Sequence, residues 1–177
     1  PRDLTCRVLF LDPSKGKDAK HGDYSAIIRL GRCRDGQLWC EADLARRHTP
    51  IIVADMLEHG RLFRPDIVGV EINQFQELLA DDIAAQSAAK GVMLPIVGVD
   101  NHVNKFVRIR RIGPYLARRN IRFKADSPGT ELLVQQLQEF PEAEHDDGPD
   151  ALEGAIRIMG EYIDGMQAEQ RETVYTA

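Results

Sequence analysis

The chain has 177 residues, of which 43% are hydrophobic and 29% are charged. This is enough for one compact domain with a sizeable core and too short for two full-sized domains. No stretch approaches the ~20 apolar residues of a membrane span, and the N-terminus lacks a secretory pattern, so we expect neither a membrane partner nor secretion. Three cysteines, at positions 6, 33 and 40, are an odd number without CxxC spacing and favour a reduced intracellular compartment.

The positive charge is concentrated in one segment. Residues 101–124 hold eight basic side chains and no acid, whereas the rest of the chain carries 15 basic and 28 acidic residues. This polarity suits a polyanionic partner held by one face of the molecule. The spacing of Lys105, Arg108 and Arg111 predicts one helix face that contacts a DNA backbone without reading its sequence. The alternative, a helix whose arginines pair with acids elsewhere in the fold, stays open.

The first half of the chain predicts strands and helices in a regular order. Short apolar runs predict strands at residues 6–12, 24–31 and 38–44, which are close enough together for an antiparallel meander. Thr49 and Pro50 mark a helix start. A strand at 67–71, a helix at 74–90 and a strand at 92–99 follow.

The second half is mainly helical. The basic segment predicts a helix interrupted at Gly113 and Pro114, then a strand at 121–123 and a helix near 130–139. A long amphipathic helix opens at residues 145–150, and the tail from about residue 171 is expected to be loosely ordered. The whole order predicts an α/β fold with a mixed sheet, three antiparallel strands followed by parallel strands, flanked by helices.

Acidic residues stand at the ends of elements that should be buried. Asp12 closes the first strand, Glu71 closes the fourth, and Asp146, Asp147 and Asp150 open the last helix. Each alone is explained as a turn residue or a helix cap. If the first and fourth strands are neighbours, however, Asp12 and Glu71 lie side by side, and the helix could bring Asp147 or Asp150 against them. Converging carboxylates repel one another unless a cation intervenes, and oxygen ligands favour Mg²⁺ or Mn²⁺. Two such ions ~3.5–4 Å apart serve phosphodiester cleavage.

Four short motifs occur in a fixed order along the chain. They are FLDPS at residues 10–14, GDYSA at 22–26, VGVEIN at 68–73 and HDDGPDAL at 145–152. Together they resemble the C-terminal nuclease domain of the large terminase subunit of tailed bacteriophages, and so do Lys105-x-x-Arg108 and residues 121–123. The similarity runs from about residue 6 to residue 160.

The resemblance implies a single RNase H-like nuclease domain over residues 1–177. It also implies two Mg²⁺ or Mn²⁺ ions and an endonuclease that cuts concatemeric double-stranded viral DNA during genome packaging. Its partners would be a terminase ATPase domain, a small terminase subunit and a portal, in the host cell cytoplasm. Nothing matches G-x-x-x-x-G-K-S/T and the chain starts at Pro1, so we expect the nuclease half without its ATPase domain.

The resemblance also assigns the site residues. Asp12 would bridge both metals, and Glu71 and Asp147 would hold one each. Within the last cluster Asp147 is favoured as the third catalytic carboxylate, Asp150 is a further metal ligand one helical turn later, and Asp146 is the least favoured.

Two accessory residues and two other functions stay open. Asp23 is a possible additional ligand or phosphate contact, and His145 either assists at the metals or is a surface residue. The chain is alternatively another RNase H-like nuclease, of the resolvase or RNase H type. It is otherwise a non-catalytic nucleic-acid-binding module whose acids only cap elements.

Overall fold

One mixed sheet organises the molecule. The computed structural model describes residues 3–13, 24–72 and 77–175. The strands are β1 (Leu4–Asp12), β2 (Ser25–Cys33), β3 (Leu38–Ala45), β4 (Ile67–Glu71), β5 (Ile96–Val99) and β6 (Ile121–Phe123). The six strands lie in the order β5-β4-β1-β2-β3-β6. The pairs β1–β2 and β2–β3 are antiparallel, whereas β4 pairs with β1, β5 with β4 and β6 with β3 in parallel. This confirms the predicted meander followed by parallel strands.

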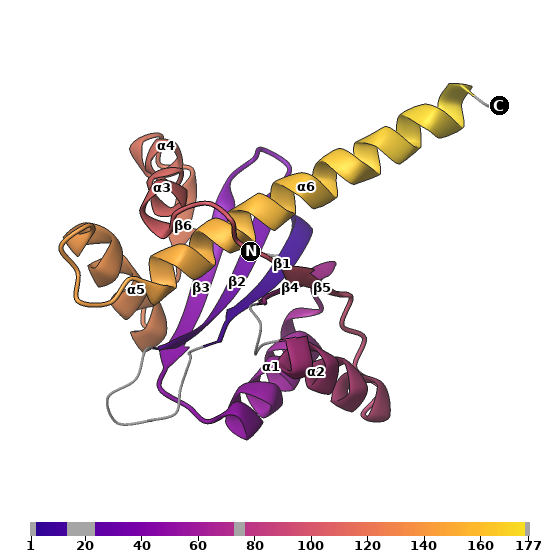
Figure 1. Ribbon diagram of the computed structural model, residues 1–177. Helices are drawn as coiled ribbons and strands as arrows, with labels where there is room; N and C mark the ends of the chain where they lie inside the picture. The colour runs from indigo at the N-terminus through magenta and orange to yellow at the C-terminus, as the bar shows by residue number, and fades with distance from the viewer. Residues whose placement is uncertain (1–2, 14–23, 73–76, 176–177) are drawn as a thin grey trace.

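Helices cover both faces of the sheet. They are α1 (Thr49–Phe63), α2 (Glu77–Ala89), α3 (Lys105–Arg110), α4 (Gly113–Ala117), α5 (Pro128–Glu139) and α6 (Asp147–Tyr175). Figure 1 shows α6 crossing one face, with α1 and α2 lying together away from it. The C-terminal part of α6 projects well beyond the sheet (Figure 1). Within the described part of the chain, no helix has both the length and the hydropathy that a bilayer crossing requires.

The central strand shows why the sheet needs both layers. Val8, Leu9, Phe10 and Leu11 of β1 are all fully buried. Val8 and Phe10 pack in the core beneath α5 and α6, whereas Leu9 and Leu11 pack in the core beneath α1 and α2. A continuous apolar run of this kind is typical of a strand that is covered on both faces.

The element boundaries agree with the sequence prediction only in part. The strand expected at 92–99 is shortened to β5, because Pro95 has no N–H for the strand ladder. The interruption at Gly113 and Pro114 is confirmed, since it separates α3 from α4. Helix α6 is described as far as Tyr175. The amphipathic start of α6 continues as one helix because no proline or cap ends it after Pro149.

Candidate active site

Two carboxylates lie next to each other at one edge of the sheet. Strands β1 and β4 are parallel neighbours, with Leu11 opposite Val70 in the register. Asp12 and Glu71 are the next residues along these strands, and each is the last residue of its strand. Because parallel strands end at the same edge, the two side chains meet there, as the sequence predicted.

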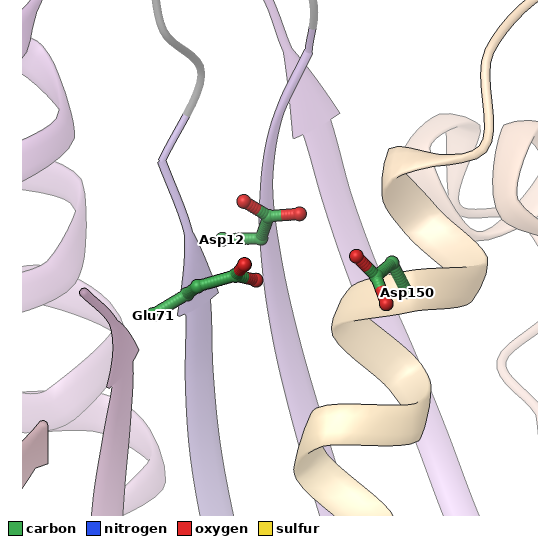
Figure 2. Close-up of side chains that lie close together, drawn as sticks. All are labelled: Asp12, Glu71 and Asp150. Atoms are coloured by element: carbon green, nitrogen blue, oxygen red, sulfur yellow. The ribbon is translucent and has the colours of Figure 1, made fainter. Parts of the chain in front are cut away.

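The third carboxylate comes from the first turns of α6. Asp12, Glu71 and Asp150 each offer an oxygen, and these oxygens all lie within 4.8 Å of one another. Figure 2 shows the three side chains converging from two strands and the helix. Segments far apart in the chain thus build one acidic cluster, which we call the carboxylate trio.

The packing of α6 explains why Asp150 completes the trio rather than the favoured Asp147. The start of α6 is anchored to α5, because the Gly148 N–H donates to Oε1 of Gln136 at 3.0 Å. At Gly154 the helix lies directly against Phe10 of β1. Asp150 lies between these two anchors, where α6 crosses towards β1.

Asp147 and Asp146 lie beside the trio. Asp147 is buried, and its Oδ2 accepts a hydrogen bond from the Tyr24 N–H at 3.1 Å. The ammonium of Lys105 lies 2.7 Å from Asp146, 3.6 Å from Asp147 and 3.8 Å from Asp150. Asp147 therefore lies at the edge of the carboxylate trio, whereas Asp146 is paired with Lys105.

Burial and mutual repulsion perturb the trio strongly. Burial raises the pKa of Asp12 well above its ordinary value, and the negative charges of Glu71 and Asp150 raise it further. Burial also raises the pKa of Asp150 to about 6, although Arg108 and Lys105 act in the opposite direction. For Lys105, burial lowers the pKa, but the hydrogen bond to Asp146 and the surrounding acids outweigh burial and raise it overall. Such perturbed carboxyl groups in one cluster are typical of functional sites.

Two basic residues of α3, and Arg111 directly after it, face the acids of α6. The Arg108 side chain is 6% exposed and donates to Asp150, while Arg111 lies 3.3 Å from Glu153. With Lys105, these residues share one helix face, as their spacing predicted. That face packs on α6, so the buried Arg108 does not offer the phosphate contact expected of it. The alternative in which basic residues pair with acids within the fold holds for all three.

Of the two accessory residues, Asp23 and His145, the structure describes only His145. Asp23 lies outside the described residues. His145 packs edge-on against Tyr24 at 5.1 Å between ring centroids, and its Nε2 accepts from Arg46 at 3.2 Å. Arg46 also lies over the Tyr24 ring, 4.6 Å from its centroid.

Sequence reasoning missed several residues of this edge. Tyr24 lies within the GDYSA motif but was not singled out as a site residue, and Arg46 lies in no motif. Glu153 follows Asp147 and Asp150 at intervals of three, so the acidic stripe of α6 was visible in the spacing.

The carboxylate trio fits a hard divalent cation. Its ligands are oxygens, which Mg²⁺ and Mn²⁺ prefer. Among the described residues, the buried Oδ1 of Asp150 has no hydrogen-bond partner. A buried carboxylate oxygen without a donor is costly, and a cation would satisfy it.

Comparison with known proteins supports the fold. The sequence matches no family model and no curated protein. Among solved structures, the yeast mitochondrial Holliday junction resolvase Ydc2 is similar, with a TM-score of 0.52 and 14% identity over 86% of this chain and 78% of that one. The HK97 bacteriophage large terminase is similar with a TM-score of 0.57 and 13% identity over 88% of this chain.

The match to the terminase covers 39% of that protein, so this chain spans about two fifths of its length. At these identities the likeness shows the fold and not the activity. The mixed six-stranded sheet, its flanking helices and these structural neighbours together show that the chain has the RNase H-like fold that its motifs predicted.

Proposed function

We propose that this chain is a divalent-metal-dependent nuclease that cuts DNA. The observation that carries the proposal is the convergence of Asp12, Glu71 and Asp150 at one edge of the sheet, with oxygens within 4.8 Å of one another. A stable fold has no need of three acids in that position, because their repulsion opposes their burial. The RNase H-like fold and its two nuclease-type neighbours support the same reaction class.

The trio would hold the cation, and Asp147 is the candidate for a further ligand if two ions bind. Bound Mg²⁺ or Mn²⁺ supplies positive charge that activates water and stabilises the charge developing on the phosphate. The half-exposed ammonium of Lys105, at the rim of the trio, would contact the phosphate being cut. Asp12 and Glu71 end two paired parallel strands, so the sheet places both side chains at the same edge for binding a cation.

Within this class we propose the terminase role. The chain would cut concatemeric viral DNA during packaging, in the host cell cytoplasm, together with an ATPase domain, a small terminase subunit and a portal. Support comes from the four ordered motifs and from the similarity in fold to the HK97 bacteriophage large terminase.

A junction resolvase is the second candidate. The match to the yeast resolvase covers 78% of that chain, against 39% of the terminase, so most of the resolvase chain has a counterpart in this fold. A resolvase would prefer branched DNA to linear duplex.

Cleavage of supercoiled plasmid tests the proposal. We expect nicking and linearisation with Mg²⁺ or Mn²⁺, and none with EDTA. Asp12→Asn should remove the cutting while the protein stays folded, because the amide keeps the shape of the side chain but not its charge. Asp35→Asn, in the exposed turn after β2 at the opposite end of the strands, is the matched control and should cut normally.

Three outcomes decide against parts of this proposal. Full activity of Asp12→Asn would remove the carboxylate trio from the reaction. Faster cutting of a four-way junction than of linear duplex would favour the resolvase, and cutting confined to RNA–DNA hybrids would favour an RNase H.

A further inference from the structure

A buried ion pair joins α3 to the carboxylate trio. Nη2 of Arg108 lies 2.6 Å from Oδ2 of Asp150, and the two side chains are 6% and 4% exposed. The two residues are 42 positions apart in the chain, so only the packing of α3 on α6 brings them together. Ile109 of α3 and Ile112, just before α4, are buried in the same core as α6 and hold this segment against it.

A contribution to stability does not by itself explain why this buried pair is present. Among the described residues, Nε of Arg108 and Oδ1 of Asp150 are both buried without a hydrogen-bond partner. A buried ion pair offsets the loss of hydration only when its remaining donors and acceptors are also satisfied. Apolar residues of similar volume would serve the packing as well, so the pair points to a role outside stability.

The two oxygens of Asp150 have different surroundings. Oδ2 accepts from the guanidinium, whereas Oδ1 has no donor in the described part of the chain. A carboxylate that ligates a cation needs one oxygen aimed at the ion, and a fixed partner on the other oxygen limits its rotation.

We propose that Arg108 is a positioning residue: its guanidinium holds Oδ2 of Asp150 so that Oδ1 is presented to a divalent cation shared with Asp12 and Glu71. The inference rests on the proposed function, because it concerns the same site. It reverses the role that the sequence predicted for Arg108, since the side chain supports a ligand instead of contacting DNA.

Lys105 does not fill this role. Its ammonium lies 3.8 Å from Oδ2 of Asp150 but 2.7 Å from Asp146, and its side chain is 36% exposed. An ammonium is a flexible point charge, whereas a guanidinium directs its N–H groups in one plane. Arg108 is therefore the group that fixes the orientation of Asp150.

Metal binding without nucleic acid is the measurement. Titration calorimetry with Mn²⁺ and with Ca²⁺ would compare the wild-type chain with Arg108→Met and Arg108→Lys. We expect Arg108→Met to weaken binding about 10- to 100-fold, the usual effect of losing a partner of a metal ligand. Arg108→Lys should recover part of the affinity, because it restores the positive charge without the planar donors.

Arg157→Met is the matched control. Arg157 lies on α6 and donates to Asn101 at 2.7 Å, so its loss removes an arginine from the same region without touching the trio. Its metal affinity should equal that of the wild type. Circular dichroism in EDTA checks folding. Arg108→Gln, whose neutral and shorter side chain ends near the position of Nε and lacks the contact that Nη2 makes, replaces Arg108→Met if the latter does not fold.

The outcomes separate this inference from the proposed function. A wild-type chain that binds no divalent cation would overturn both. Metal binding by the wild type together with equal binding by a folded Arg108→Met or Arg108→Gln would overturn the inference alone. Weakened binding in Arg108→Met with normal binding in Arg157→Met would support it.

Discussion

At the scale of single residues, the fold disfavours the charged forms of Asp12 and Asp150. Burial and repulsion raise the pKa of both carboxyl groups, that of Asp150 from 3.8 to about 6. In the metal-free folded chain these groups keep protons at pH values where the unfolded chain has lost them. Proton uptake therefore favours the folded state as the pH falls through about 6.

This gives a pH-dependent prediction for the metal-free protein. In EDTA, the thermal midpoint should be higher near pH 5.5 than near pH 7.5, by ~2–4 °C for each kcal/mol of stability. Mg²⁺ or Mn²⁺ should raise the midpoint at the higher pH more than at the lower, because protons and cations compete for the same oxygens. Differential scanning calorimetry measures both effects.

Asp12→Asn is the control for that measurement. Removing one charge relieves the repulsion on Glu71 and Asp150, so the variant should be more stable than the wild type at pH 7.5 without metal. Its stability should also change less between the two pH values. An identical pH dependence in both proteins would show that the stability change arises elsewhere, for instance at the pair of His59 and Asp43.

At the scale of elements, the site depends on how closely α6 approaches the sheet. An added methyl group at Gly154 would lie 2.3 Å from Cζ of Phe10, whose side chain is fully buried. No other residue type permits this approach without moving the ring or the helix. Asp150 lies one turn earlier on α6, so this contact also sets how far Asp150 lies from Asp12 and Glu71.

Gly154→Ala should therefore disturb both the fold and the site. We expect a loss of about 1–3 kcal/mol from overpacking, together with weaker Mn²⁺ binding as Asp150 moves. Gly160→Ala, further along α6 with nothing within 4 Å of the added methyl group, should instead stabilise the helix by ~0.5–1 kcal/mol. Urea unfolding compares the stability of the two variants, and Mn²⁺ titration compares their metal binding. A Gly154→Ala protein as stable as Gly160→Ala would contradict the close approach of α6 to Phe10.

At the scale of the whole molecule, charge opposes the proposed substrate. The net charge is −5, and the basic residues Lys105, Arg108 and Arg111 that we expected to contact DNA lie against acids of α6 and the residue before it. Of the three, the Arg111 side chain is 51% exposed and that of Lys105 is 36% exposed, whereas Arg108 is buried. Divalent cations in the carboxylate trio would reverse the sign of the field at the point where a phosphate must approach.

DNA binding should therefore depend on divalent cations. With Ca²⁺ in place of the ions that support cutting, affinity for a labelled duplex should be about tenfold higher than in EDTA at the same ionic strength. Fluorescence anisotropy measures the two dissociation constants. Asp12→Asn should lose most of the difference, and equal affinity with and without Ca²⁺ in the wild type would show that other surfaces bind the DNA.

Much of this organisation was determined by the sequence. Apolar runs that end in Asp12 and Glu71 defined two strands and placed an acid at the end of each, because residue type and local spacing decide where a strand begins and ends. The acids of the last helix were visible in the same way. The order of the four motifs then predicted the RNase H-like fold, which the sheet topology and the structural neighbours confirm.

The tertiary structure alone decided which side chains meet. The choice between Asp147 and Asp150 depended on the anchoring of α6 at Gly148 and on its contact at Gly154, neither of which local spacing encodes. The burial of Arg108 depended on α3 packing on α6, across 42 residues of chain. Periodicity shows which residues share a face of a helix, but the partner of that face is set by long-range packing, and packing is a property of the whole fold.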